Sequence, residues 1–198
     1  MARRHRLWIV ADEIYGRFFY GATRAPSFRD VMDEDDRILF VQTFSKNWAM
    51  TGWRLGWLEA PPALGQVIEN LIQYSTSGVA VPLQRAGIAA LDHGESLITE
   101  QVALARANRD LLVARLAGHN RIILPAPTGA FYLFFGIHGL PDSRAAAIRL
   151  IDETGLGLAP GSAFGAGGEG FMRLCYLRKR ADIAEAADRL IAGLARLP

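Results

Sequence analysis

Reactive side chains follow two apolar segments that have the composition of buried strands. Asp12 comes directly after the apolar residues 7–11, and Tyr15 lies in the turn beyond it. The second segment, residues 38–41, is followed by two hydroxyls, an amine and a guanidinium: Thr43, Ser45, Lys46 and Arg54. Open α/β sheets bind their ligands at the carboxyl ends of strands. Hydroxyls and a guanidinium bind phosphate and a lysine amine reacts with a carbonyl, so this set suits a phosphorylated carbonyl compound.

Three motifs in this part of the chain resemble those of the class I and II aminotransferases, which are pyridoxal-phosphate enzymes of fold type I. The motifs are Asp12-Glu13-Ile14-Tyr15, Thr43-Phe44-Ser45-Lys46 and Gly52-Trp53-Arg54-Leu55-Gly56. Their order and spacing fit the family, and a further match lies in residues 159–165 and 170–174. The family usually has serine where Thr43 stands, but both residues supply a hydroxyl. The resemblance covers the whole chain and implies pyridoxal 5'-phosphate as the cofactor.

The resemblance implies a role for each matched side chain. Lys46 is expected to bind the cofactor covalently and, once displaced, to take the Cα proton of the substrate. Asp12 is expected to pair with the pyridine nitrogen, and Tyr15 with the phenolic oxygen. The cofactor phosphate is expected to be bound by Thr43, Ser45 and Arg54. Arg173 matches the family arginine that grips the substrate α-carboxylate, a task suited to a planar, bidentate donor.

Each of these assignments has a simpler structural alternative. Asp12 by itself would cap a turn, and Lys46 would be a surface lysine, although apolar residues flank it on both sides. Tyr15 would pack among its aromatic neighbours Phe18, Phe19 and Tyr20. Arg173 would form a structural ion pair on a strand. Glu13 is expected to point to the opposite side of the strand from Asp12, so we give it no catalytic role.

A glycine-rich stretch at residues 165–170 fits the dinucleotide-binding fingerprint by residue type. That fingerprint requires a strand before it and a helix after it. Here residues 171–177 follow directly and are predicted to form a strand. We therefore reject nucleotide binding at this stretch.

The apolar patterns predict an α/β fold. Continuous apolar runs are typical of strands covered on both faces in a mostly parallel sheet. Strands are expected at residues 7–11, 38–41, 53–58, 131–135 and 171–177. Helices are expected at residues 82–94, 97–117 and 143–153 and in the final segment with Ile183, Ala187, Leu190 and Leu194 on one face. The resemblance assigns residues 1–104 to the back part of the large cofactor-binding domain and residues 105–198 to the small α+β carboxyl-terminal domain.

Composition and charge argue against several other classes of protein. The apolar runs are far shorter than the roughly 20 residues that cross a membrane, and no export signal is expected. Cys175 is the only cysteine, so no internal disulfide and a reducing, cytoplasmic setting are expected. The four histidines lie far apart, so no metal site is expected. With a net charge of +2, the small cluster at residues 178–180 does not predict nucleic-acid binding.

Members of the family are about twice as long as this chain. We therefore expect a fragment, a misplaced start or one piece of a split gene. In each case the chain lacks the amino-terminal half and, with it, much of the interface of a homodimer. Three functions remain open: amino transfer between an amino acid and a 2-oxo acid, a lyase reaction at the same site, and a non-catalytic remnant that only binds partners. The substrate side chain is not identified, because the residues that read it are expected largely in the other half and in the partner subunit.

Overall fold

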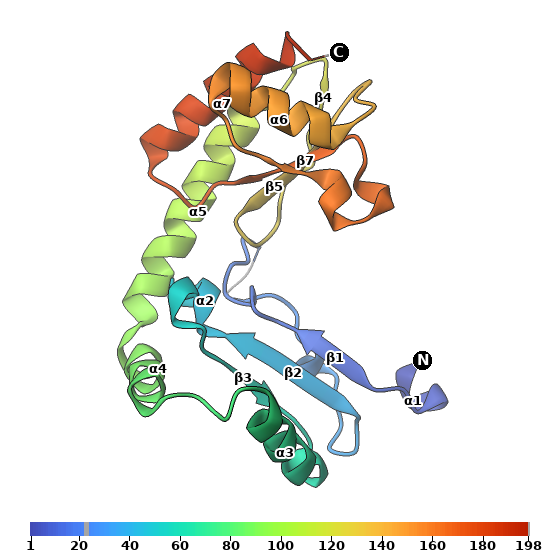
Figure 1. Ribbon diagram of the computed structural model, residues 1–198, viewed down its shortest axis with the longest axis vertical. Coiled ribbons are helices and arrows are strands. Elements are labelled where there is room, and N and C mark those ends of the chain that lie inside the picture. The colour runs from blue at the N-terminus through green and yellow to red at the C-terminus, as the bar shows by residue number, and fades with distance from the viewer. Residues whose placement is uncertain (22–23, 198) are drawn as a thin grey trace. The chain divides into compact units, whose positions relative to one another are not determined.

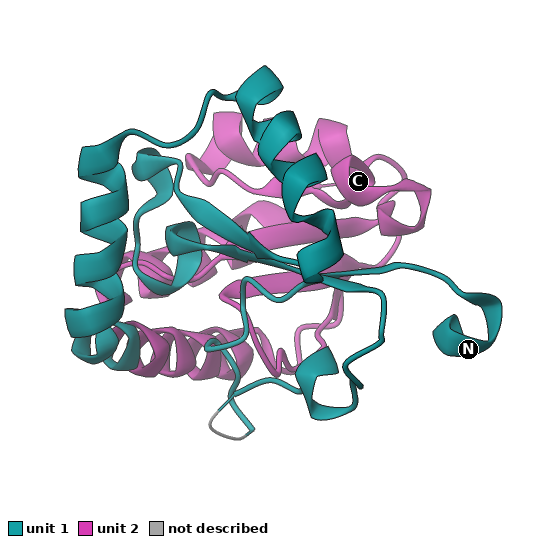
Figure 2. Ribbon diagram, turned by 90° about the horizontal axis from the view of Figure 1, so that it is seen from below, with its two compact units in different colours: residues 1–100 teal, residues 101–198 magenta. Residues whose placement is uncertain are grey.

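The computed structural model describes residues 1–21 and 24–197 (Figure 1). The chain forms two compact units, Met1–Glu100 and Gln101–Pro198, which Figure 2 distinguishes by colour. The division falls within the helix α5, Glu95–Leu116. The domain boundary expected after residue 104 lies in the same helix and stays a prediction.

Unit 1 contains a three-stranded sheet in the order β1-β2-β3. β1 (Ile9–Asp12) runs parallel to β2 (Ile38–Thr43), and β3 (Gly56–Glu59) is antiparallel to β2. The three expected strands are present, but β1 and β3 begin later than predicted. The residues before β3 instead form a 3-10 helix, η2 (Thr51–Trp53). The described sheet is therefore mixed rather than mostly parallel.

The two faces of this sheet differ in how they are covered. Ala11, Ile38 and Phe40 are buried together on one face. Side chains alternate between the faces of a sheet, and on the other face Val10 is 63% exposed and Leu58 is 43% exposed. Among the described residues β1 is thus covered on one face only, because nothing among them buries Val10, and a cover on its second face stays a prediction.

Several helices precede, separate or follow these strands along the chain. They are α1 (Ala2–His5), α2 (Phe44–Asn47), α3 (Gly65–Ser75) and α4 (Val81–His93), with 3-10 helices η1 (Phe28–Asp30) and η3 (Pro62–Leu64). The predicted helix at residues 82–94 is confirmed by α4, which has Pro82 in its first turn and Gly94 as its C-cap. The sequence did not predict α3, and this helix buries none of its own residues within the described chain.

Unit 2 contains an antiparallel sheet in the order β4-β5-β7-β6. The strands are β4 (Ile122–Ile123), β5 (Tyr132–Ile137), β6 (Ala159–Pro160) and β7 (Phe171–Cys175). The strands predicted near residues 131 and 171 are confirmed as β5 and β7. One face of these two strands is buried and carries Leu133, Phe135, Met172 and Leu174. The other face is half-buried and carries Tyr132, Phe134, Phe171 and Arg173.

The helices of this part of the chain agree with the sequence patterns. They are α5, α6 (Ser143–Thr154) and α7 (Arg180–Leu194), with short 3-10 helices η4 (Gly161–Phe164) and η5 (Ala166–Gly168) before β7. Asp142 caps α6 by accepting a hydrogen bond from the Ala145 backbone N–H at 2.8 Å, and Gly155 ends the helix with φ +66°. The buried face of α7 includes the four predicted residues, Ile183, Ala187, Leu190 and Leu194.

A buried side-chain contact ties α5 to the segment that follows β7. Asn108 is fully buried, and its Nδ2 donates to the backbone oxygens of Tyr176 and Arg178 at 2.8 Å each. Residues 165–170, with η5, lead directly into β7 and not into a helix. This order agrees with the rejection of a dinucleotide site there.

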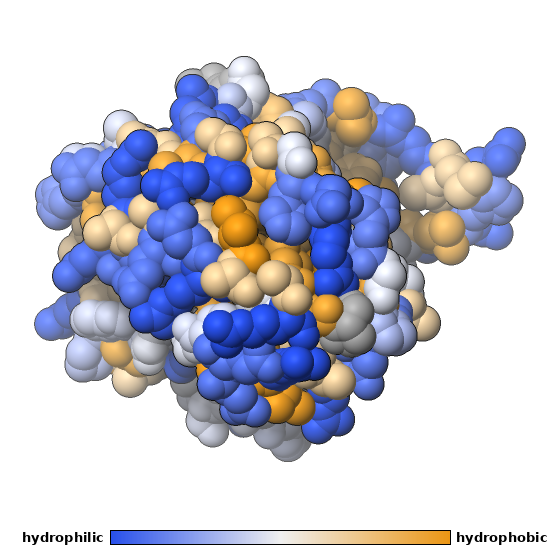
Figure 3. Space-filling model, turned by 90° about the horizontal axis from the view of Figure 1, so that it is seen from above, coloured by the Kyte–Doolittle hydropathy of each residue, from blue (hydrophilic) through white to orange (hydrophobic). Residues whose placement is uncertain are grey.

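Most of the face of the molecule drawn in Figure 3 is hydrophilic, with apolar residues exposed between the polar ones. Within the described residues, no helix is both long enough and apolar enough to cross a membrane.

Candidate functional site

Lys46 lies on α2, the short helix that begins where β2 ends. Thr43 is the N-cap of this helix, and its Oγ1 accepts a hydrogen bond from the Ser45 backbone N–H at 3.1 Å. The hydroxyls of Thr43 and Ser45 are also hydrogen-bonded to each other at 3.0 Å. Threonine is a favoured N-cap, so the motif that carries Lys46 also starts the helix that presents it. Lys46 itself is half-buried.

Arg54 lies at the far end of the loop that contains Lys46. The loop is closed at its base, because the Phe44 backbone N–H donates to the Leu55 oxygen at 3.1 Å. Gly56 then pairs with Thr43 across β2 and β3. Arg54 is exposed, has a φ of 52° and donates from its guanidinium to the Thr51 oxygen at 3.0 Å. The loop closure therefore places the second and third motifs in one structural segment.

An aromatic cluster supports this loop. The ring of Phe44 lies 5.0 Å from that of Trp48 and 5.1 Å from that of Trp57, measured between ring centroids. Gly87 of α4 packs on the same place, since a Cβ at this position would come within 2.8 Å of Leu55 Cδ2. These supporting residues were not predicted from the sequence. The gathering of aromatic residues around the lysine motif is the signal that would have found them.

Asp12 and Tyr15 follow β1, the parallel neighbour of β2. Parallel strands end at the same edge of a sheet, and Asp12 pairs with Val41 near the end of β2. The Lys46 Nζ atom lies 5.9 Å from the centroid of the Tyr15 ring. The structure thus brings the first two motifs to one edge. Asp12 Oδ1 also accepts a hydrogen bond from the Ile14 backbone N–H at 3.3 Å, so this exposed carboxylate caps a turn as well.

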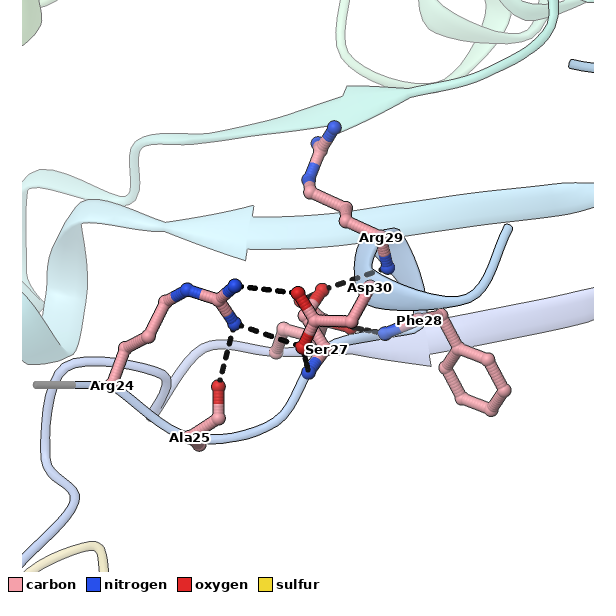
Figure 4. Close-up of polar contacts among 7 residues, drawn as sticks. Arg24, Ala25, Ser27, Phe28, Arg29 and Asp30 are labelled. Atoms are coloured by element: carbon pink, nitrogen blue, oxygen red, sulfur yellow. Dashed lines mark hydrogen bonds and ion pairs between the residues drawn. The ribbon is translucent and has the colours of Figure 1, made fainter. Parts of the chain in front are cut away.

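Glu13 is engaged in hydrogen bonds with the segment that contains residues 24–30, whose own polar contacts are drawn in Figure 4. Its carboxylate accepts hydrogen bonds from the Ser27 hydroxyl at 2.7 Å and the Phe28 backbone N–H at 3.0 Å. Ser27 and Asp30 form a capping box at the start of η1. Hydrogen bonds from the Arg24 side chain and the Ser27 backbone lower the pKa of Asp30 to about 2. Glu13 therefore anchors the segment after β1.

Arg173 lies on β7 in unit 2, on the half-buried face of the sheet. Its guanidinium carbon is 4.1 Å from the centroid of the Phe164 ring and 4.5 Å from that of Tyr132. Within the part of the chain that the structure describes, the Arg173 side chain forms no hydrogen bond or ion pair. The alternative of a structural ion pair on the strand is therefore not supported by the described residues.

The side chains of unit 1 form a donor set that fits pyridoxal phosphate. The group needs an amine for its aldehyde, cationic and hydroxyl donors for its phosphate, and a carboxylate for its pyridinium nitrogen. Among the described residues, neither Lys46 nor Arg54 has an ion-pair partner, so both cations are available to a ligand. The hydroxyls and the carboxylate that complete the set are those of Thr43, Ser45, Tyr15 and Asp12.

The family comparison covers nearly the whole chain. The sequence profile described as Aminotransferase class I and II matches residues 1–190. An aspartate aminotransferase from Pinus pinaster is 35% identical over 83% of this chain and 36% of its own length. An aspartate aminotransferase from Thermotoga maritima is 31% identical over 96% of this chain and 48% of its own length.

Solved structures lead to the same family. The crystal structure of the Thermotoga maritima aspartate aminotransferase matches with a TM-score of 0.88 at 31% identity, over 98% of this chain and 49% of that one. An aromatic aminotransferase from Pyrococcus horikoshii matches with a TM-score of 0.90 at 29% identity, over 98% and 52%. The chain thus spans about half the length of these relatives, or less, and matches their carboxyl-terminal half. From its sequence and its fold, the chain belongs to the class I and II aminotransferases.

Proposed function

We propose that this chain supplies the carboxyl-terminal half of a pyridoxal-phosphate aminotransferase, which moves an amino group between an amino acid and a 2-oxo acid. The observation that carries the proposal is the arrangement of Lys46 at the end of β2, beside Tyr15 and on the same closed loop as Arg54. Family membership and the names of the relatives support the same reaction.

Five side chains besides Lys46 are proposed to hold the cofactor. Arg54 binds the phosphate through charge-assisted hydrogen bonds, and each such bond contributes about 1.5 to 3 kcal/mol. Asp12 keeps a proton on the pyridine nitrogen, and Tyr15 hydrogen-bonds the phenolic oxygen. The hydroxyls that complete the phosphate site are those of Thr43 and Ser45.

The proton transfer is proposed to use Lys46. When bound, pyridoxal phosphate supplies an electron sink for the electrons released as the substrate Cα–H bond breaks. A free lysine amine has a pKa of about 10.4 and is mostly protonated at neutral pH, so its site must release it as a neutral base. The Lys46 Nζ atom then takes the proton from the substrate Cα. Arg173 is proposed to bind the substrate α-carboxylate.

The lysine assignment can be tested by labelling, because Lys46 and Lys179 are the two lysines of the chain. The chain is co-expressed with a polypeptide corresponding to the amino-terminal half of the Thermotoga maritima aspartate aminotransferase; we call this pair the complemented chain. It is incubated with pyridoxal phosphate, reduced with borohydride and digested, and the labelled peptide is identified by mass spectrometry. We expect the label on Lys46.

Matched variants make this result specific. Lys179→Arg should keep the label, and Lys46→Arg should lose it without changing the far-ultraviolet circular dichroism. A label that maps to Lys179 would overturn the assignment. Product analysis separates the reaction classes: amino transfer to an added 2-oxo acid supports the proposal, whereas product that forms without an acceptor supports a lyase. Failure of the complemented chain to retain the cofactor would favour a non-catalytic role.

A further inference from the structure

The surroundings of Arg173 are aromatic instead of acidic. Its guanidinium lies over the rings of Phe164 and Tyr132, at 4.1 and 4.5 Å from their centroids, and the residue is half-buried. Burial of a charge is costly unless something compensates it. A ring face attracts a cation, so the two rings supply that compensation without an acidic partner.

The two rings reach Arg173 from different elements. In the β5–β7 register, Phe134 is directly opposite Arg173, and Tyr132 is opposite Cys175. Tyr132 is thus the diagonal neighbour of Arg173 on the same face, a distance that long side chains can span. Phe164 ends η4, which follows β6, and β6 pairs with β7 at Ala159 and Arg173. Strand register therefore fixes one ring, and the turn after β6 fixes the other.

The turn that carries Phe164 is itself held in place. Ser143, at the start of α6, is fully buried, and its hydroxyl donates to the Ser162 hydroxyl at 2.9 Å. Gly161 and Gly168 pack backbone against backbone, since a Cβ on Gly161 would come within 2.1 Å of the Gly168 oxygen. Phe164 remains 48% exposed. A rigid turn that leaves a large aromatic side chain half in solvent next to a cation is consistent with a positioning role.

The chemistry of the guanidinium gives this arrangement a purpose. An aromatic ring interacts with the face of the guanidinium, whereas a carboxylate binds the N–H groups at its edge. An acidic partner in the chain would occupy those N–H groups and compete with a substrate. Aromatic rings restrict the long side chain and leave its donors unpaired, so less rotamer entropy is lost when a carboxylate binds.

We propose that Tyr132 and Phe164 form an aromatic bracket that positions the guanidinium of Arg173 for a carboxylate ligand. The two bracket residues are positioning residues, because they act through Arg173. This inference rests on the proposed role of Arg173 in binding the substrate α-carboxylate, but the restraint itself can be measured without any ligand.

The first experiment measures the restraint in the complemented chain. The protein is labelled with 15N-arginine, and the Nε–Hε signal of Arg173 is identified by its absence in Arg173→Lys. We expect its heteronuclear Overhauser effect to be clearly higher than that of Arg144, an exposed arginine on α6. Phe164→Leu should lower the Arg173 value toward that of Arg144. Equal mobility of the two arginines in the unaltered protein would overturn the bracket.

Matched variants separate the bracket from general packing. Phe171 lies on the same face of the sheet as Arg173, but its ring stacks on that of Phe134, at 5.2 Å between ring centroids. Phe171→Leu should therefore leave the mobility of Arg173 unchanged, and Phe164→Tyr should restore the restraint that Phe164→Leu removes. If Phe171→Leu loosens Arg173 as much as Phe164→Leu does, the effect is one of packing and the proposal is wrong.

The second experiment adds a carboxylate. Pyruvate is titrated into the complemented chain, with the uncharged amide of pyruvate as control, and the shift of the Arg173 signal is followed. We expect Phe164→Leu to weaken pyruvate binding about three- to tenfold, because the long Arg173 side chain would then have to be immobilised when the ligand binds. In amino transfer, the same variant should raise the KM of the amino acid and leave kcat nearly unchanged.

The two experiments distinguish the two proposals. If Arg173 is restrained but pyruvate does not shift its signal, the proposed carboxylate role of Arg173 fails while the restraint stands. If pyruvate binds Arg173 equally well with and without the Phe164 ring, the bracket does not serve the ligand and the inference is wrong.

Discussion

The two glycines that flank Arg54 meet different surroundings. A Cβ on Gly56 would lie 2.6 Å from the Gln42 backbone oxygen, at the point where β3 pairs with β2. A Cβ on Gly52 would meet no atom of the described chain within 4 Å. Chain packing therefore explains glycine at residue 56. It does not explain glycine at residue 52, where the open space beside the loop suits a bound ligand.

Alanine substitutions should separate these two roles. Gly56→Ala is expected to destabilise the protein by about 1 to 3 kcal/mol, because backbone must shift to admit the new methyl group. Gly52→Ala is expected to change stability by less than about 0.5 kcal/mol and to weaken retention of pyridoxal phosphate. Urea unfolding of the complemented chain measures the loss of stability. Cofactor absorbance after gel filtration of the same sample measures the retention of pyridoxal phosphate. Equal loss of stability in both variants would contradict this distinction.

At the scale of elements, one carboxylate joins the start of α6 to the approach to β7. Glu169 accepts hydrogen bonds from the backbone N–H groups of Ser143 at 2.6 Å and Gly170 at 3.1 Å. Hydrogen bonds from Ser143, chiefly the one from its backbone N–H, hold the pKa of Glu169 below its usual range. Because Ser143 also bonds Ser162, this carboxylate helps to fix the turn that presents Phe164.

The contribution of Glu169 to stability should depend on pH. A carboxyl group whose pKa is lower in the folded state stabilises that state above its unfolded pKa, which is about 4.3 for glutamate. The contribution is lost as pH falls through the lowered folded value. Glu169→Gln should therefore lower the unfolding midpoint at pH 7, and the difference from the unaltered protein should shrink below about pH 4. A difference that stays constant between pH 7 and pH 3 would contradict the assignment.

A matched substitution provides the control for this titration. Glu100 is exposed on α5, and within the described residues its side chain has no hydrogen bond or ion pair. Glu100→Gln should leave the unfolding midpoint nearly unchanged across the same pH range.

At the scale of the whole molecule, unit 1 leaves much apolar surface uncovered. The sheet face with Val10 and Leu58 is open, and α3 buries none of its residues. Other exposed apolar side chains of this unit are Leu7, Trp8, Val67, Leu71, Ile72, Ile88 and Leu91. β1 is also an edge strand with part of its backbone unpaired. Since the chain spans about half the length of its relatives or less, we propose that a polypeptide equivalent to their other half covers these surfaces.

The 198-residue chain produced by itself is therefore expected to aggregate and to show no amino transfer. The complemented chain should be monodisperse by size-exclusion chromatography with light scattering. Catalysis also needs the reacting groups to be held in the correct geometry, and this positioning lowers the activation barrier by several kcal/mol. A monodisperse preparation of the chain alone that retains pyridoxal phosphate and transfers amino groups would contradict this expectation.

Local signals in the sequence were sufficient for much of the secondary structure. Pro82 marks the start of α4 and Gly94 marks its end. Gly155 ends α6 in the left-handed conformation that favours glycine. The buried face of α7 follows from the spacing of its apolar residues. Such signals depend on neighbours along the chain, so they can be read without the fold. α3 was missed because its amphipathic pattern has no strong cap.

The motifs likewise predicted the chemistry proposed for the site without showing how the site is supported. The roles proposed for Lys46, Arg54 and Asp12 follow from the resemblance of their motifs to those of the family. The closeness of Lys46 to Tyr15 could not be predicted from the motifs, because it depends on the parallel pairing of β1 with β2. The ring contacts of Arg173 depend in the same way on the β5–β7 register and on the turn after β6. Contacts between residues far apart in sequence are decided by strand pairing and turn geometry, and only the tertiary structure contains those.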